Sequence, residues 1–137
     1  MIILDTNVIS DLIANPDGKV ARRVAAAADQ VCITSITLAE LRYGVELLPH
    51  GRRRESLEEV ISVWAEMLGS ELILPFDGNA AEAFGRIRSA RRIMDRPITF
   101  ADAAIAAVSE FHKATLYTGN TKDFEHTGVN LFNPWLD

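Results

Sequence analysis

The sequence predicts an α/β domain in which helices flank a mainly parallel sheet of about five strands. Short apolar segments alternate with longer segments of helical spacing along the whole chain, which is the order that repeated βα units produce. The short segments are continuously apolar, as expected of strands that are covered on both faces. A length of 137 residues corresponds to one domain, so we expect residues 1–137 to form a single domain.

In the first half of the chain, the sequence MIIL at residues 1–4 predicts a buried strand. Asp5, Thr6 and Asn7 are helix-capping types, and they precede a helix over VISDLI that the sequence NPDG ends. Further along, the pattern predicts an Ala-rich helix, a second strand and two more helices, at 19–28, 31–34, 35–48 and 52–68. Pro49 and Gly69 mark the ends of the last two helices.

In the second half, Pro75 closes a third strand at 72–74, and Asp77 is the expected cap of the next helix. The remaining elements are two helices, a strand, a loop and a short fifth strand, expected at 79–94, 99–112, 114–117, 118–122 and 129–132. We expect the functional residues to follow the ends of the strands, because ligands of such sheets bind beyond the carboxyl ends of the strands.

Composition excludes several classes of protein. With 14 basic and 19 acidic residues the net charge is −5, which argues against a passive nucleic-acid coat. The lone Cys32 cannot form an internal disulfide or a Cys-based zinc site, so we expect a buried thiol in a reducing compartment. Neither a membrane span nor a signal peptide is apparent, and we therefore expect a cytoplasmic protein.

Several acidic and amide side chains lie directly after predicted strands or within helices that are otherwise apolar. Asp5 follows the first strand, Asn120 and Asp123 follow the fourth, and Glu40 and Asp102 lie in helices that are otherwise apolar. Each acid alone has a structural explanation as a helix cap, since Thr37 precedes Glu40 and Thr99 precedes Asp102 by three residues.

Taken together, these positions favour a metal site. If strands one and four are neighbours, the acids converge at one edge of the sheet, where like charges repel unless a cation intervenes. Carboxylates without basic partners suit Mg²⁺ or Mn²⁺, and ions held this way position water and stabilise charge on a phosphate. His50, His112 and His126 have no zinc-site spacing, and no P-loop, G-x-G-x-x-G or G-x-S-x-G motif is present.

Four motifs, LDTNVIS, TLAELRYG, TFADAAIAA and TGNTKDF, occur in the order of the PIN-domain ribonucleases, and the chain resembles this family over essentially its whole length. The terminal FNPW makes it most similar to the VapC and FitB toxins of toxin–antitoxin systems. The resemblance implies a PIN-like three-layer sandwich and an Mg²⁺- or Mn²⁺-dependent endoribonuclease that leaves 5′-phosphate and 3′-hydroxyl ends. Transfer RNA or ribosomal RNA is the implied substrate.

The resemblance also implies roles for individual residues. The metal ligands are Asp5, Glu40 and Asp102, with Glu40 also suited to activate the attacking water. The fourth acidic position is Asp123 or, through its amide, Asn120. Supporting roles near the metal fall to Thr6, Asn7 and Thr118. Arg86, Arg88 and Arg92 are candidates to hold the RNA backbone by charge-assisted hydrogen bonds.

Partners are implied as well. A VapB- or FitA-type antitoxin is expected to cross the acidic groove, and DNA is expected to associate only indirectly, through that antitoxin. A homodimer, and a larger assembly with the antitoxin, are typical of the family; the helices at 35–48 and 52–68 are candidates for the dimer interface.

Alternative interpretations remain open. The main alternative is a non-catalytic PIN-like module that binds RNA or a partner without cutting, which the three acids argue against. A phosphotransfer receiver lacks support because its adjacent acids after strand one are missing, and a haloacid-type phosphatase because Asn7 stands where a second Asp belongs.

Overall fold

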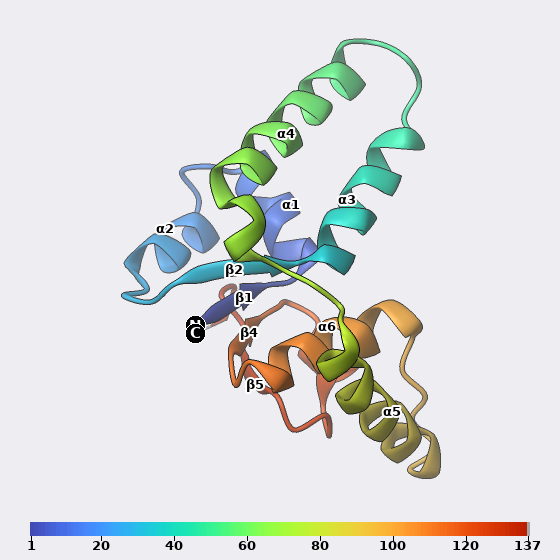
Figure 1. Ribbon diagram of the computed structural model, residues 1–137. Coiled ribbons are helices and arrows are strands. Elements are labelled where there is room, and N and C mark those ends of the chain that lie inside the picture. The colour runs from blue at the N-terminus through green and yellow to red at the C-terminus, as the bar shows by residue number, and fades with distance from the viewer. Residues whose placement is uncertain (137) are drawn as a thin grey trace.

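A five-stranded parallel sheet organises the protein, seen here in a computed structural model that describes residues 1–136 (Figure 1). Across the sheet, the strands run in the order β3 (Ile73–Leu74), β2 (Val31–Thr34), β1 (Ile2–Leu4), β4 (Thr115–Tyr117) and β5 (Asn130–Phe132). All neighbouring pairs are parallel, and β1 lies at the centre between β2 and β4. The carboxyl ends of the strands therefore share one edge, as the sequence predicts.

Helices cover both faces of the sheet (Figure 1). One face packs against α1 and α2 and against parts of α3 and α4, whose bounds are Thr6–Ala14, Lys19–Ala26, Ser35–Glu46 and Arg52–Leu72. The other face packs against α5 (Gly78–Ile93) and α6 (Phe100–Phe111). A single 3₁₀ turn, η1 (Thr121–Phe124), follows β4. The resulting three layers confirm the predicted α/β class.

Alternation along β1 divides the core in two. Ile3 is fully buried against the α5–α6 side, while Ile2 and Leu4 are buried against the α1–α2 side. Cys32 is also fully buried, in the α5–α6 core. Since every residue of β1 is inaccessible to solvent, the residue after the strand emerges at a fixed position on the edge of the sheet.

Most element bounds agree with prediction to within two residues, and the differences have local causes. Helix α1 begins at Thr6, directly after Asp5, because Asp5 itself caps it. The long helical segment of α4 ends at Gly69, as predicted, where a φ of 64° kinks the chain, and a further short helical turn reaches Leu72 before β3. Part of the expected loop at 118–122 is the η1 turn.

The α3 and α4 helices form a hairpin that projects beyond the sheet (Figure 1). Its outward side carries exposed apolar side chains, namely Tyr43, Leu47, Val63 and Met67. None of the helices within residues 1–136 combines the length and the apolar character needed to cross a lipid bilayer.

Candidate active site

Asp5 is held at the central carboxyl edge of the sheet by three hydrogen bonds. Its Oδ1 accepts from the backbone N–H of Thr6 at 2.8 Å. Its Oδ2 accepts from the side-chain amide of Asn7 at 2.9 Å and from the hydroxyl of Thr118 at 2.8 Å. The residue is only 4% exposed, and this burial raises the pKa of Asp5 against the opposing effect of the three hydrogen bonds.

Asn7 and Thr118 join the loops that follow β1 and β4. The side-chain Oδ1 of Asn7 accepts from the backbone N–H of Gly119 at 3.0 Å, while the Thr118 hydroxyl accepts from the backbone N–H of Asn120 at 3.0 Å. The predicted supporting residues thus act as a frame around Asp5, and one carboxylate oxygen, Oδ1, is left with a single donor.

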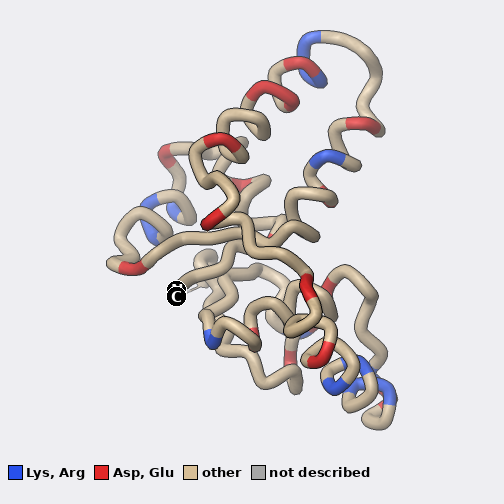
Figure 2. The backbone as a smooth tube through the Cα atoms, viewed as in Figure 1, with Lys and Arg blue, Asp and Glu red and all other residues tan. Residues whose placement is uncertain are grey.

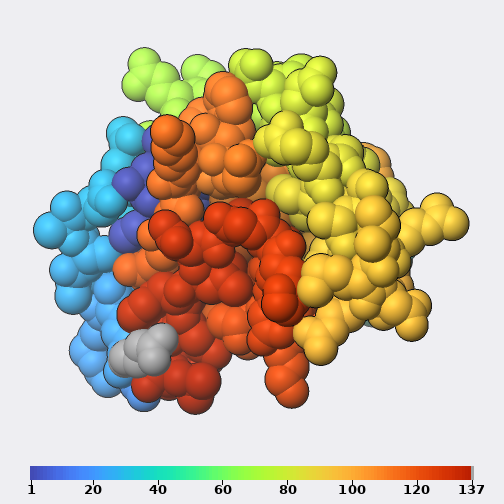
Figure 3. All heavy atoms as spheres, turned by 90° about the horizontal axis from the view of Figure 1, so that it is seen from below, coloured from blue at the N-terminus to red at the C-terminus, as the bar shows by residue number. Residues whose placement is uncertain are grey.

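Trp135 covers the second of these loops. A Cβ atom placed on Gly119 would meet ring carbons of Trp135 at 2.9 and 3.0 Å, so no larger residue fits there without displacing the indole. The carbonyl of Trp135 accepts from Lys19 Nζ at 2.8 Å, which ties this end of the chain to α2. In Figure 3 the C-terminal residues accordingly lie against the segment around residues 15–30. The FNPW sequence was noted as a family feature, but this packing role was not predicted.

Glu40 is placed on α3 and joins the site through Thr6, whose hydroxyl donates to Oε1 at 2.6 Å. Two expectations about Glu40 are wrong. The apolar pattern of its helix suggests that Glu40 is enclosed by apolar side chains, but Glu40 is half-buried, and Tyr43 and Leu47 on the same helix are each 66% exposed. It also forms no capping box with Thr37, because α3 begins at Ser35, as predicted, and its cap is Thr34.

Asp102 lies in the first turn of α6, where the Thr99 side chain accepts from its backbone N–H at 3.2 Å. The predicted capping by Thr99 is therefore present, and it leaves Asp102 on the site side of the helix. Burial and the negative charges of Asp5, Asp123 and Glu40 raise the pKa of Asp102 to about 6. The charges of the other three acids therefore act on Asp102 at this edge.

The fourth position is shared by Asn120 and Asp123 at the two ends of one short turn. Both side chains are exposed, and the backbone N–H of Asp123 donates to the carbonyl of Asn120 at 3.0 Å. The charge of Asp123 acts on both Asp5 and Asp102, raising the pKa of each. Of the two candidates for the fourth position, Asp123 is therefore the one whose negative charge acts on the other acids of the site.

Among residues 1–136, none of the acids Asp5, Glu40, Asp102 and Asp123 forms an ion pair with a basic side chain. In the same residues, no three His, Cys, Asp or Glu side chains form a group that could enclose a metal ion. Mg²⁺ is commonly bound through one or two carboxylates and several waters, so the oxygen-only donors here fit such a partly hydrated ion.

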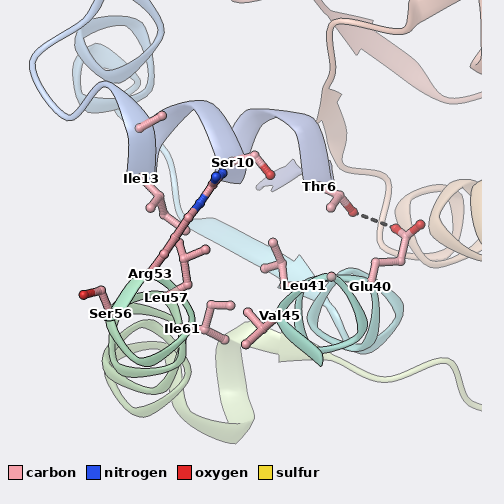
Figure 4. Close-up of a pocket in the computed structure, with 12 residues that line it drawn as sticks. Thr6, Ser10, Ile13, Glu40, Leu41, Val45, Arg53, Ser56, Leu57 and Ile61 are labelled. Atoms are coloured by element: carbon pink, nitrogen blue, oxygen red, sulfur yellow. Dashed lines mark hydrogen bonds between the residues drawn. The ribbon is translucent and has the colours of Figure 1, made fainter. Parts of the chain in front are cut away.

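An apolar groove of about 620 Å³ opens beside Glu40 and Thr6, between α1, α3 and α4 (Figure 4). Leu41, Val45, Leu57 and Ile61 are among the residues that line it, with Arg53 across its far end. The groove reaches the acidic edge at Glu40, so a segment lying in it would pass next to the carboxylates.

The arginine cluster of α5 does not act as one surface. Arg91 is 5% exposed and donates to the backbone carbonyls of Arg96, Asp123 and Glu125 at 2.7, 2.8 and 3.0 Å. Arg91 therefore fixes the η1 turn to helix α5 through these backbone carbonyls. Arg86 pairs with Glu110, whereas Arg88 and Arg92 are exposed.

The protein is thus of the α/β class, with acidic side chains gathered at the carboxyl edge of a parallel sheet, where ligands of such sheets bind. A family model described as the PIN domain matches residues 2–130. The chain belongs to this PIN-domain family.

Relatives within the family are toxins and ribonucleases. Toxin FitB of Neisseria gonorrhoeae is 38% identical, with all of both chains covered. The VapC ribonuclease Y4jK of Sinorhizobium fredii is 34% identical, with 98% of each chain covered. The crystal structure of FitAcB from Neisseria gonorrhoeae superposes with a TM-score of 0.90 and 37% identity over the full length of both chains. Further structural neighbours are VapBC complexes of toxin–antitoxin systems.

Proposed function

We propose that this protein is an Mg²⁺- or Mn²⁺-dependent endoribonuclease and the toxin of a VapBC-type toxin–antitoxin system. The observation that carries the proposal is the convergence of acids at one sheet edge: Asp5 is framed by hydrogen bonds, Thr6 links it to Glu40, and the charges of Asp5, Glu40 and Asp123 all act on Asp102. Within residues 1–136, none of these acids belongs to an ion pair. The names of the relatives support ribonuclease activity. Residues 1–137 form a single PIN domain in this proposal, and the site works in the cytoplasm.

Asp5 and Asp102 are the residues that would hold the metal ion, which supplies charge stabilisation at the scissile phosphate. Asp5 is presented rigidly by Thr6, Asn7 and Thr118, so its orientation is fixed before substrate arrives. Burial and nearby negative charges raise the pKa of Asp102, and a bound cation would lower that pKa by stabilising the ionised carboxylate.

Glu40 is the residue that orients or deprotonates the attacking water. Its Oε1 accepts from Thr6, which fixes the side chain and leaves Oε2 available to accept a proton from water. Asp123 adds negative charge beside Asp5 and Asp102, and is preferred over Asn120 as the fourth acidic group. Asn120 supports the turn through its backbone.

The test is cleavage of total tRNA and rRNA by purified, antitoxin-free protein, with Mg²⁺, with Mn²⁺ and with EDTA. We expect metal-dependent cutting that leaves 5′-phosphate ends and is lost in Asp102→Asn. Asp77→Asn is the matched control, because Asp77 is also a helix-start acid but caps α5. Metal binding by isothermal titration calorimetry is measured beside it. A folded wild type that neither cuts nor binds metal would instead support a non-catalytic binding module.

The apolar groove beside Glu40 is the proposed binding site of an antitoxin of VapB or FitA type. An apolar segment in the groove with a basic residue at Glu40 would complement both the lining and the charge. DNA then associates with the toxin only through the antitoxin. Gly44→Trp, which adds bulk to the groove lining, is expected to weaken antitoxin binding and to leave metal binding intact.

A homodimer is proposed through the projecting α3–α4 hairpin, whose exposed apolar side chains are Tyr43, Leu47, Val63 and Met67. Assembly with the antitoxin would then give a larger complex. Light scattering on the Leu47→Lys and Met67→Lys variants tests this, and we expect both to be monomeric at concentrations where the wild type is a dimer.

A further inference from the structure

The outer surface of α5 carries an aromatic and two basic side chains in one row. Phe84, Arg88 and Arg92 are spaced four residues apart, so they lie along the same side of the helix. The Arg88 guanidinium carbon sits 5.7 Å from the centroid of the Phe84 ring, in cation–π geometry. Within residues 1–136, neither arginine belongs to an ion pair, so both charges are available to a ligand.

A hollow of about 560 Å³ lies beside this row. It is lined by Arg88, Ser89, Arg92, Asp95, Pro97 and Ile98. Two positive charges and one negative charge make the hollow net positive in a chain whose net charge is −5. Figure 2 shows basic residues gathered at this end of α5, away from the second basic group at the start of α4.

An exposed aromatic ring stands at the other side of the row. Phe100 is 53% exposed, and its ring centroid lies 5.0 Å from that of Phe84 and 6.1 Å from that of Phe76. These neighbours fix its orientation while leaving one part of the ring open. Phe100 and Asp102 both belong to the first turn of α6, so the ring lies at the same end of this helix as a site acid, on a different side of the helix.

We infer that Arg88, Arg92 and Phe100 form a subsite for single-stranded RNA, in which the arginines bind phosphates and Phe100 stacks on a base. The inference rests on the proposed ribonuclease function. A polyanion is repelled by the acidic edge and needs compensating positive charge next to it. Every base offers a π-face to an aromatic platform, so this arrangement also suits an unpaired strand better than a duplex.

The test measures binding of a fluorescein-labelled 12-nucleotide RNA by fluorescence anisotropy in EDTA, where a metal-dependent nuclease cannot cut. Arg88→Ala and Arg92→Ala are each expected to weaken binding and to reduce the slope of log affinity against log salt by about one. Phe100→Ala is expected to weaken binding by about tenfold, with the salt slope unchanged. Asp95→Asn should strengthen binding, and Asn suits the left-handed φ of 58° at that position.

Arg52→Ala is the matched control, because it removes one exposed positive charge from the first residue of α4, on a different helix from the proposed subsite. We expect its RNA affinity to stay within about twofold of wild type. Equal losses in Arg52→Ala and the two α5 variants would overturn the subsite. So would unchanged affinity in the α5 variants, or a Phe100→Ala variant that changes only the oligomeric state in light scattering.

Cleavage assays with Mg²⁺ separate this inference from the proposed function. The subsite predicts a raised KM with kcat unchanged for Arg88→Ala and Arg92→Ala. If wild-type protein binds RNA through these residues but never cuts it, the nuclease proposal fails and the subsite stands. If the protein cuts RNA and the three variants have wild-type KM and affinity, the nuclease proposal stands and the subsite fails.

Discussion

The hydroxyl of Thr118 donates to Oδ2 of Asp5 at 2.8 Å, across 113 residues of sequence. This contact joins the loop after β4 to the loop after β1, the two adjacent strands at the centre of the sheet. A buried carboxylate that lacked this donor would be costly, because its remaining partner at Oδ2 is the Asn7 amide alone.

Replacing the hydroxyl tests this relationship directly. Thr118→Val keeps the shape of the side chain but removes the donor, so we predict a loss of about 2 kcal/mol in the free energy of unfolding. Urea unfolding at pH 7.5 in EDTA measures it. Thr118→Ser retains the hydroxyl and should lose less than about 1 kcal/mol. Equal losses in both variants would assign the effect to packing instead.

The raised pKa of Asp102 makes stability depend on pH in the metal-free protein. Its pKa is about 6 in the folded chain and near 3.8 when unfolded, so the folded state binds the proton more tightly. Stability is therefore lost as pH rises from about 4 to about 6. Asp102→Asn should reduce that loss and be more stable at pH 7.5 by about 1 kcal/mol, a value discounted because solvent screens a half-exposed carboxylate.

Thermal unfolding between pH 4 and pH 8 in EDTA measures the Asp102 effect. Asp5 also has a raised pKa and remains in the variant, so the pH dependence should shrink but not vanish. Glu82→Gln removes an exposed acid on α5 and should follow the wild-type curve. An Asp102→Asn curve parallel to wild type would contradict the prediction.

Gly119 leaves no room for a side chain under Trp135. Gly119→Ala places a methyl group 2.9 Å from the indole, so we predict a loss of about 1 to 3 kcal/mol and a shift in tryptophan fluorescence. Gly85→Ala is the matched control, because a methyl group in the middle of α5 meets nothing within 4 Å. That variant should gain about 0.5 to 1 kcal/mol from improved helix propensity.

Arg91 is a structural residue in a segment that otherwise faces solvent. Arg91→Ala strands three backbone carbonyls, and we predict a loss of about 3 kcal/mol or more in urea unfolding. Arg92→Ala removes an adjacent, exposed arginine and should change stability by less than about 0.5 kcal/mol. Similar stability in the two variants would show that the carbonyls find other partners.

The layered fold was predictable because its strands are short, apolar and separated by helices. This pattern is local and can be read directly from segments such as MIIL and VCIT. Asp5 was predictable for the same reason, since it follows the first strand. The capping explanation for Glu40 was wrong even though the end of β2 and the start of α3 were predicted correctly, because Thr34, which directly precedes α3, is the cap, and Thr37 lies inside the helix. The contacts of Arg91 and Trp135 join residues distant in sequence, and no periodic pattern encodes them.

The surroundings of Asp5 are completed by residues made late in synthesis, because Asn7 contacts Gly119 and Gly119 packs beneath Trp135. At about 5 to 20 residues per second, the ribosome makes Asp5 many seconds before the loop that completes its surroundings. A nascent or prematurely ended chain lacks Thr118, Gly119 and Trp135, and with them the frame around the carboxylate. The proposed nuclease would thus stay harmless to the ribosome that makes it until translation is nearly finished.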